Sequence, residues 1–279
     1  MLKPLTGIAL LLLLYCGAMA RQNQYFFRKL GVADGLNDGN ILVISQDTKG
    51  FMWFATRSGL NRYDGYSVKT YSYIAGDSTS LPTALIRSMA ADSAGNFWIG
   101  TENGLLQYDA GTDRFLPVRA FEGIWIGQII AAGKHTLYLG TSKGLIAYDV
   151  DTRQAQYYTQ EKEKLLHTRV YDITWRNKQL YLATANGLLR FDPATQSTQK
   201  IDIPAIANEV IIAIAMDDKN NCWLATKGAT VLLKYNLQRH TTNYYGRYFE
   251  SGPHTIANFT SLMTDNRGRV WVTTQLNGL

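Results

Sequence analysis

The sequence predicts an all-β protein, a β-propeller of four-stranded blades, and three observations support this fold class. A short apolar strand motif recurs six times at intervals of 40 to 48 residues, which is the repeat length of propeller blades. Aromatic residues make up 12% of the chain, and aromatic side chains favour pleated strands. Helical repeats of similar length would need a helical periodicity, which the sequence lacks. We therefore expect five complete blades and a truncated sixth.

The N-terminal segment, residues 1–20, predicts a signal peptide. Lys3 supplies a short positive region, an almost wholly apolar run extends from Leu5 to Gly17, and Ala18 to Ala20 has the small-x-small pattern of a cleavage site. The apolar run is shorter than the roughly 20 residues of a membrane span, and no second such run follows it. We expect cleavage before Arg21 and export to the periplasm, with a retained N-terminal anchor as the alternative.

The two cysteines predict no disulfide. Tyr15 precedes Cys16 where a lipoprotein signal would carry a small residue, so we do not expect lipidation. Cleavage would remove Cys16 and leave Cys222 alone, and a single cysteine cannot form an internal disulfide. Cys222 stands beside Trp223 in an apolar strand pattern. This position is typical of a small buried hydrophobic residue.

The composition indicates a packed globular domain. Hydrophobic residues make up 46% and charged residues 18% of the chain, and the formal net charge is +6, which argues against disorder. The basic residues are scattered and form no patch of the kind that binds nucleic acid, so we expect no nucleic-acid partner.

Each repeat places a threonine at the end of its apolar strand, and a short turn, a glycine and an apolar residue follow. These threonines are Thr56, Thr101, Thr141, Thr184, Thr226 and Thr274. Around them we delimit an incomplete propeller over residues 21–279, with blades at about 41–73, 85–120, 125–159, 170–203, 210–247 and 256–279. Before the first blade, Tyr25 to Leu30 predicts a lone strand that could pair with the last blade and protect exposed sheet edges.

The second repeat shows how one blade is built. We expect its four strands at Leu85–Ala91, Asn96–Thr101, Gly104–Tyr108 and Arg114–Arg119. A tight turn from Asp92 to Gly95 joins the first two strands. Similar turns start at Asp47, Asp217 and Asp265.

One aromatic residue recurs at the same place in every repeat. These residues are Trp53, Trp98, Tyr138, Tyr181, Trp223 and Trp271. A large flat side chain can fill the gap between neighbouring blades, and recurrence in every repeat favours this packing role over a ligand platform.

The sequence contains no recognisable catalytic set and predicts no enzyme, no metal and no cofactor. The four histidines, His135, His167, His240 and His254, stand far apart and lack metal-ligand spacing. The serine motif of hydrolases is missing. Asp64, Asp109, Asp149 and Asp192 each end the third strand of a repeat, where aspartate forms turns.

Blade geometry nominates one face for ligand binding. The turns between the second and third strands share a face with the links between blades, and their residues vary from repeat to repeat. The alternative is that these residues are ordinary surface. The candidates are Arg57, Tyr73, Glu102, Phe121, Trp125, Lys143, Asn186, Lys227 and Tyr248, and the same turns and links add His167, Phe249 and Gln275.

Several motifs resemble those of a known family. They lie at Asp34 to Leu36, Gly50 to Thr56, Gly59 to Gly65, Ser80 to Pro82 and Asp92 to Thr101. In these motifs the chain resembles the two-component regulator propeller family, which opens the sensor region of hybrid two-component systems in Bacteroidetes-type bacteria. The resemblance extends over all the repeats and is weakest at residues 227–231.

The resemblance implies a longer receptor, anchored in the inner membrane. Such receptors have two periplasmic propellers of seven blades, an Ig-like domain, one membrane helix and a histidine kinase, often with a receiver and a DNA-binding domain. This chain would be an N-terminal fragment or the product of a truncated gene. It would sense an oligosaccharide or another small periplasmic ligand, without catalysis, and its partners would be the remaining propeller and kinase modules of a homodimer.

Two other functions stay open, a propeller-fold polysaccharide lyase or hydrolase and a protein-binding scaffold.

An unclosed ring would leave apolar blade faces in water. Burial of apolar surface contributes roughly 25 cal/mol per Å², so we expect a marginally stable chain that associates through its open end.

Overall fold

The computed structural model describes residues 29–77, 80–158, 168–207, 209–227, 232–245 and 259–274. The predicted signal peptide lies outside these residues, as does most of the predicted strand at Tyr25–Leu30. Lys29 and Leu30, the described end of that segment, are not in a strand.

The described chain forms five four-stranded antiparallel sheets and one two-stranded sheet. The first sheet contains β1 (Ile41–Gln46), β2 (Met52–Thr56), β3 (Gly59–Tyr63) and β4 (Val68–Tyr71). The second contains β5 (Ile86–Ala91), β6 (Phe97–Thr101), β7 (Gly104–Asp109) and β8 (Arg114–Val118). The third contains β9 (Ile126–Ala132), β10 (Thr136–Thr141), β11 (Gly144–Asp149) and β12 (Ala155–Tyr157).

The remaining sheets follow the same order. The fourth contains β13 (Val170–Arg176), β14 (Gln179–Thr184), β15 (Gly187–Asp192) and β16 (Ser197–Ile201). The fifth contains β17 (Ile211–Met216), β18 (Asn221–Thr226), β19 (Leu232–Asn236) and β20 (Thr241–Tyr244), and the sixth β21 (Phe259–Thr264) and β22 (Val270–Thr274). Short 3-10 turns lie at η1 (Val32–Asp34), η2 (Arg119–Phe121) and η4 (Pro204–Ile206). Within the described ranges, no helix is long and apolar enough to cross a membrane.

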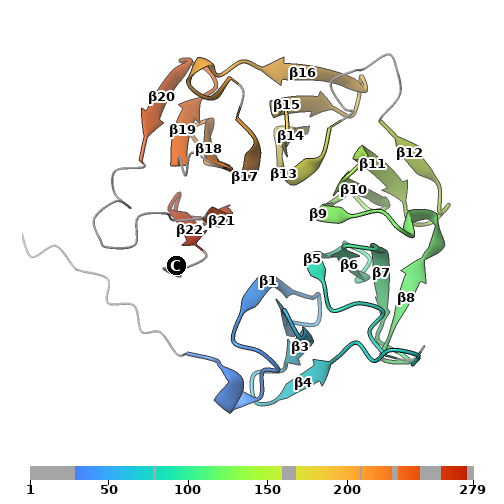
Figure 1. Ribbon diagram of the computed structural model, residues 1–279. Coiled ribbons are helices and arrows are strands. Elements are labelled where there is room, and N and C mark those ends of the chain that lie inside the picture. Colours follow the sequence, from blue (N-terminus) through green and yellow to red (C-terminus); the bar gives the residue numbers. More distant parts are fainter. Residues whose placement is uncertain are drawn as a thin grey trace, which may run out of the picture.

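The sheets are arranged around a central axis as the blades of a propeller (Figure 1). The first strands line the inside, where β1 contacts β5, β5 contacts β9, β9 contacts β13, β13 contacts β17 and β17 contacts β21. The fourth strands, from β4 to β20, lie on the outside. This arrangement confirms the predicted fold class.

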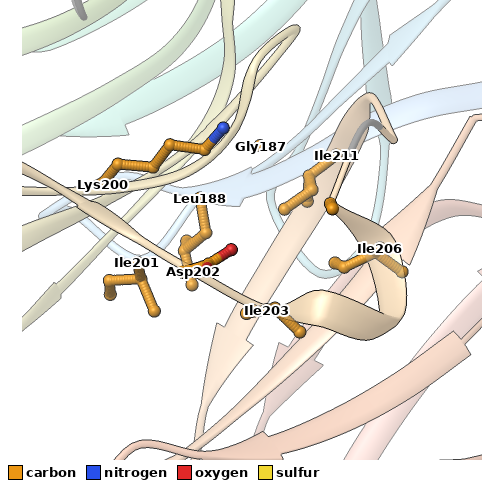
Figure 2. A pocket seen from close by; sticks show the side chains of 9 residues that line it. Gly187, Leu188, Lys200, Ile201, Asp202, Ile203, Ile206 and Ile211 are labelled. Atoms are coloured by element: carbon orange, nitrogen blue, oxygen red, sulfur yellow. The ribbon is translucent and has the colours of Figure 1, made fainter.

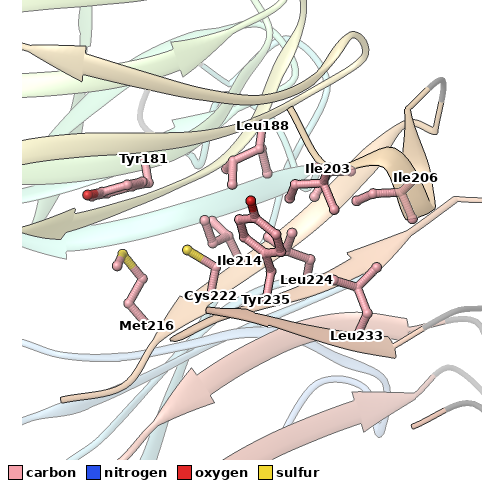
Figure 3. Close-up of a cluster of buried hydrophobic side chains, with 12 residues drawn as sticks. Tyr181, Leu188, Ile203, Ile206, Ile214, Met216, Cys222, Leu224, Leu233 and Tyr235 are labelled. Atoms are coloured by element: carbon pink, nitrogen blue, oxygen red, sulfur yellow. The ribbon is translucent and has the colours of Figure 1, made fainter. Parts of the chain in front are cut away.

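Buried hydrophobic side chains gather between neighbouring sheets. Between the fourth and fifth sheets, Tyr181 and Leu188 pack against Ile214, Cys222 and Leu224 (Figure 3). Cys222 is fully buried, as predicted. Burial raises the pKa of its thiol to about 12, so the thiol stays protonated and unreactive.

The turn aspartates fasten the recurring tryptophans. The indole Nε1 of Trp53 donates to Asp47 Oδ2 (2.8 Å), and Trp98 donates to Asp92 Oδ2 at the same distance, 2.8 Å. The two later pairs are Trp223–Asp217 (3.4 Å) and Trp271–Asp265 (3.0 Å). Each carboxylate also accepts backbone N–H groups of its own turn. The aspartates therefore form turns, as predicted, and also position the side chain that packs between blades.

The side of the first sheet that carries Ile44 is apolar and exposed. Ile44 is 57% exposed, whereas the five side chains at the same register position in the other sheets are at most 8% exposed. These five are Met89, Ile129, Ile173, Ile214 and Leu262. Leu42, close to Ile44 on β1, is 41% exposed. Within the described part of the chain, no sheet covers this face.

We expect the purified chain to associate through this face, because isolated apolar sheet surface tends to be buried between molecules. The substitution Ile44→Ser should shift the chain towards monomer in size-exclusion chromatography with light scattering. Leu116→Ser is the control, because Leu116 is similarly exposed (46%) on an outer strand. A wild-type chain that is monomeric at all concentrations would contradict the expectation.

Candidate functional site

The turns between the second and third strands are held by a buried threonine. In the second sheet, Thr101 Oγ1 donates to Gly104 O (2.9 Å) and accepts the N–H of Asn103 (3.0 Å). The same pair of bonds recurs at Thr56, Thr141 and Thr184. Because these bonds involve only the threonine side chain and the backbone, the two side chains between Thr and Gly take no part in holding the turn.

The first strand of each sheet has a register irregularity near this same face. The residues left out of the pairing are Leu42, Arg87, Gly127, Tyr171, Ile212 and Thr260. A bulge of this kind redirects a side chain at the end of a strand. Except at Gly127, these positions therefore add side chains to the face at the ends of the inner strands.

Three side chains at the starts of β9 and β13 form a cluster there, which we call the Trp125 cluster. The guanidinium of Arg169 lies 4.5 Å from the Trp125 ring centroid, and the ring of Tyr171 meets the Trp125 ring edge-on at 6.1 Å. Arg169 also lies 5.7 Å from the Tyr171 ring. Trp125 and Tyr171 are half-buried and Arg169 is exposed, so the cluster is open to solvent.

Gly127 provides the place for the Trp125 ring. A Cβ atom added at Gly127 would lie 2.1 Å from Trp125 Cη2, which is too short for a contact between non-bonded atoms. The indole therefore lies against the backbone of β9. The other bulge positions carry larger residues, so among the described sheets only the third can seat a ring in this way.

An ion pair lies on the same face, in the second sheet. Arg87, at the bulge of β5, forms an ion pair with Glu102, in the turn after β6. Both side chains are partly exposed, at 40% and 35%. Arg57 and Asp38 add further charges near this pair. The pKa of Asp38 is lowered chiefly by the hydrogen bond from the Asn40 N–H.

The predicted site residues fall into four groups, the last of which is Phe121 alone. Five are exposed on the turns and links, namely Arg57, Tyr73, Lys143, Asn186 and Lys227. Glu102 and Trp125 are half-buried and make the contacts described above. Tyr248 lies outside the described residues, together with His167, Phe249 and Gln275.

The expectation that Phe121 is a surface residue of this face is wrong. Its side chain is completely buried, and its ring meets Tyr148 edge-on at 5.0 Å in the core between the second and third sheets. The turn η2 rotates the side chain inwards, because Phe121 is the buried residue of that turn while its neighbours stay exposed.

A small hollow beside η4 does not provide a binding site. It measures about 10 Å³ and is lined mainly by Leu188, Ile201, Ile203, Ile206 and Ile211 (Figure 2). Pockets for small molecules usually measure about 300–1,000 Å³. The hollow is therefore a gap in the packing of the link between the fourth and fifth sheets.

The described residues of this face offer aromatic and charged side chains. Within the described residues, no three His, Cys, Asp or Glu side chains are grouped so that they could hold a metal ion. What the Trp125 cluster can do is stack against the apolar side of a ring and donate hydrogen bonds from Arg169.

Comparisons with known proteins bear on the fold and the repeat. The two component regulator propeller family matches residues 35–58 and 80–103, which include the Asp–Trp pairs and the threonine turns of the first two sheets. Histidine kinase P4 of Formosa agariphila is 37% identical over 62 residues, covering 22% of this chain and 4% of the kinase.

Solved structures share the fold. The extracellular domain of a putative hybrid two component system from B. thetaiotaomicron has a TM-score of 0.71 at 23% identity, covering 91% of this chain and 35% of that one. A putative one component system from the same organism gives 0.68 at 24%, covering 84% and 31%. Virginiamycin B lyase from Staphylococcus aureus gives 0.63 at 13%, covering 86% and 79%.

These similarities differ in what they show. The chain spans about a third of the length of the two B. thetaiotaomicron extracellular domains and a small part of the kinase. The likeness to the lyase, at 13% identity, shows the fold alone. The sequence motifs, the strand order and the family match agree, and the chain is a β-propeller in which two segments, 35–58 and 80–103, match the two component regulator propeller family.

Proposed function

We propose that this propeller is the ligand-sensing part of a periplasmic two-component receptor and that its ligand is an oligosaccharide bound at the Trp125 cluster. The observation that carries the proposal is an indole that lies against a strand and is open to solvent, with a guanidinium 4.5 Å from its centroid. Sugar rings have an apolar side that packs on aromatic rings, and their hydroxyl groups accept hydrogen bonds from arginine.

The wider arrangement follows from the family repeats. Residues 1–20 would direct export, and the rest of the receptor would supply the membrane anchor, further propeller blades and the kinase. The receptor would act as a homodimer. In this arrangement the chain binds the ligand and transmits the binding signal to the rest of the receptor, and turnover of the ligand is not part of its role.

The substitution Trp125→Ala should weaken oligosaccharide binding about tenfold, since the ring supplies the stacking surface. Gly127→Val should weaken it similarly, because its Cβ would displace the indole while Trp125 itself is retained. Binding can be measured by glycan array and then by calorimetry on the purified chain. The control is Trp175→Ala, because Trp175 is an exposed tryptophan (40%) at the other end of the neighbouring strand β13.

Three results would contradict the proposal. Turnover of a glycan by the wild-type chain would favour the lyase or hydrolase alternative. Binding of proteins but of no glycan would favour the scaffold. Equal binding by the Trp125→Ala and Trp175→Ala variants would place the ligand elsewhere on the molecule.

A further inference from the structure

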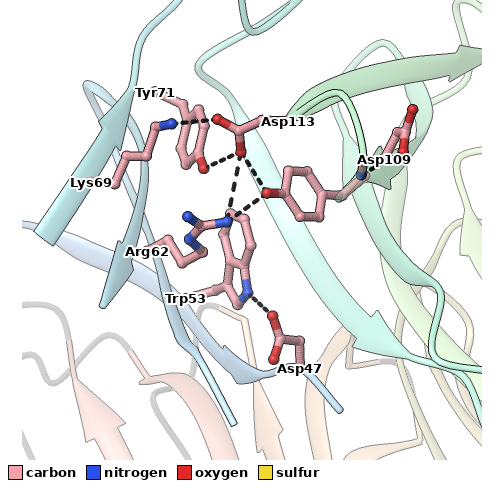
Figure 4. Close-up of polar contacts among 9 residues, drawn as sticks. Asp47, Trp53, Arg62, Lys69, Tyr71, Asp109 and Asp113 are labelled. Atoms are coloured by element: carbon pink, nitrogen blue, oxygen red, sulfur yellow. Dashed lines mark hydrogen bonds and ion pairs between the residues drawn. The ribbon is translucent and has the colours of Figure 1, made fainter. Parts of the chain in front are cut away.

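The first two sheets meet through a network of polar side chains (Figure 4). Asp113 of the second sheet accepts hydrogen bonds from Tyr71 (2.7 Å), Tyr108 (2.5 Å) and Lys69, and forms an ion pair with Arg62 at 3.6 Å. Burial alone would raise the pKa of Asp113, but the bonds from Lys69 and the two tyrosines outweigh it and lower the pKa to about 2. Burial raises the pKa of both tyrosines. With two cations and one anion, the network carries one surplus positive charge.

A recess of about 230 Å³ lies beside this network. It is on the side of the Asp47 and Gly95 turns, opposite the face that carries the Trp125 cluster. Its wall includes the aromatic rings of Phe51, Phe97 and Tyr108 and the guanidinium of Arg62, and Asp47 and Lys49 add one charge of each sign. The recess is smaller than the about 300–1,000 Å³ of sites for drug-sized ligands, so it suits only a small molecule, and three aromatic rings beside a cation suit a small aromatic anion.

Arg62 has hydrogen-bonding capacity to spare at this wall. Its guanidinium lies 4.8 Å from the Phe51 ring and 5.7 Å from the Trp53 ring. Nη1 donates to Tyr108 Oη at 2.6 Å. Among the described residues, Nε and Nη2 have no hydrogen-bond partner, so two adjacent N–H groups remain available for the two oxygens of a carboxylate.

The first sheet departs from the repeat at this recess. In the second and fifth sheets, Asn96 and Asn221 stand four residues after the turn aspartate and donate to its carboxylate at 2.9 and 2.7 Å. Gln107, at the register position of Arg62, adds a bond to Asn96 (3.2 Å). In the first sheet, Phe51 cannot make these bonds, and the polar bridge is replaced by an aromatic wall beside a cation.

We propose that this recess binds a small organic anion, a carboxylate attached to a flat apolar ring. The surplus positive charge and the free N–H groups of Arg62 match the carboxylate, and Phe51, Phe97 and Tyr108 match the ring. This site is separate from the oligosaccharide site and does not depend on it.

Benzoate is a suitable probe, and benzamide is its uncharged counterpart. The purified chain should bind benzoate about tenfold more tightly than benzamide, since a charge-assisted bond contributes more than a neutral one. Arg62→Gln should lower benzoate affinity about tenfold. Phe51→Asn, which introduces the residue found in the second and fifth sheets, should do the same, and the new side chain can bond to Asp47 as its counterparts bond to their turn aspartates.

Two control variants make the test specific. Arg190 occupies the register position of Arg62 in the fourth sheet, so Arg190→Gln should bind benzoate like the wild type. Trp125→Ala should also leave benzoate binding unchanged. Equal affinity for benzoate and benzamide, no benzoate binding, or full binding by both Arg62→Gln and a folded Phe51→Asn would overturn the proposal.

Discussion

Gly59→Ala should destabilise the chain by about 4 kcal/mol, because it combines backbone strain with a collision. Gly59 has a φ of +132°, and a Cβ there would lie 2.3 Å from the carbonyl oxygen of Tyr71. That oxygen belongs to the backbone of the neighbouring chain segment, so it cannot move without opening the first sheet. The loss should appear as a lower midpoint in urea unfolding followed by circular dichroism.

Gly65→Ala is the matched control for this effect. Gly65 also has a positive φ, +100°, but no atom lies within 4 Å of an added Cβ. Only the backbone strain remains, so the loss should be about 1 kcal/mol. If the two variants were equally stable, the close approach at Tyr71 would have no energetic weight.

Asp172→Ala should lower the free energy of unfolding by about 3 kcal/mol, because buried donors would lose their acceptor. Asp172 lies on β13 and accepts bonds from Gln128 Nε2 of the third sheet (2.7 Å), from Ile214 N of the fifth (2.9 Å) and from Ile173 N (2.8 Å). Burial raises the pKa of its carboxyl group against the effect of these donors. One side chain thus connects three blades.

The control for Asp172 is Asp218→Ala, which removes a carboxylate that is 77% exposed and pairs only with Arg176 among the described residues. Exposed pairs of this kind contribute less than about 1 kcal/mol. Both variants can be compared by urea unfolding at one pH. Similar losses in the two variants would mean that the Asp172 contacts do not hold the blades together.

The strand positions could be predicted from the sequence because each depends on a local pattern that recurs. In the second sheet, the observed strands β5 to β8 lie within one residue of the expected bounds. The bond from Trp98 to Asp92 was not predicted, although both residues were singled out. It depends on how two strands cross at their turn, and only the repetition of a six-residue offset in four repeats could have indicated it.

The candidate site was predicted less completely. Trp125 and Glu102 were identified from their place in the links and turns, but their partners Arg169, Tyr171 and Arg87 were not. Arg87 and Tyr171 stand at bulges, where the alternation of a strand gives the wrong direction for the side chain. The prediction that Phe121 lies on the surface was wrong for a related reason, because a position within a link does not determine whether the ring points inwards.

The threonine turns have a consequence for how this scaffold can change over time. Thr101 and its counterparts in the first, third and fourth sheets hold their turns through bonds to backbone atoms, so substitutions at residues such as Glu102 or Asn103 carry little folding cost. Recognition and folding are thereby assigned to different positions of the same short motif. Random libraries restricted to these turn positions should yield folded variants at high frequency, which makes the face a practical starting point for engineering new ligand preferences.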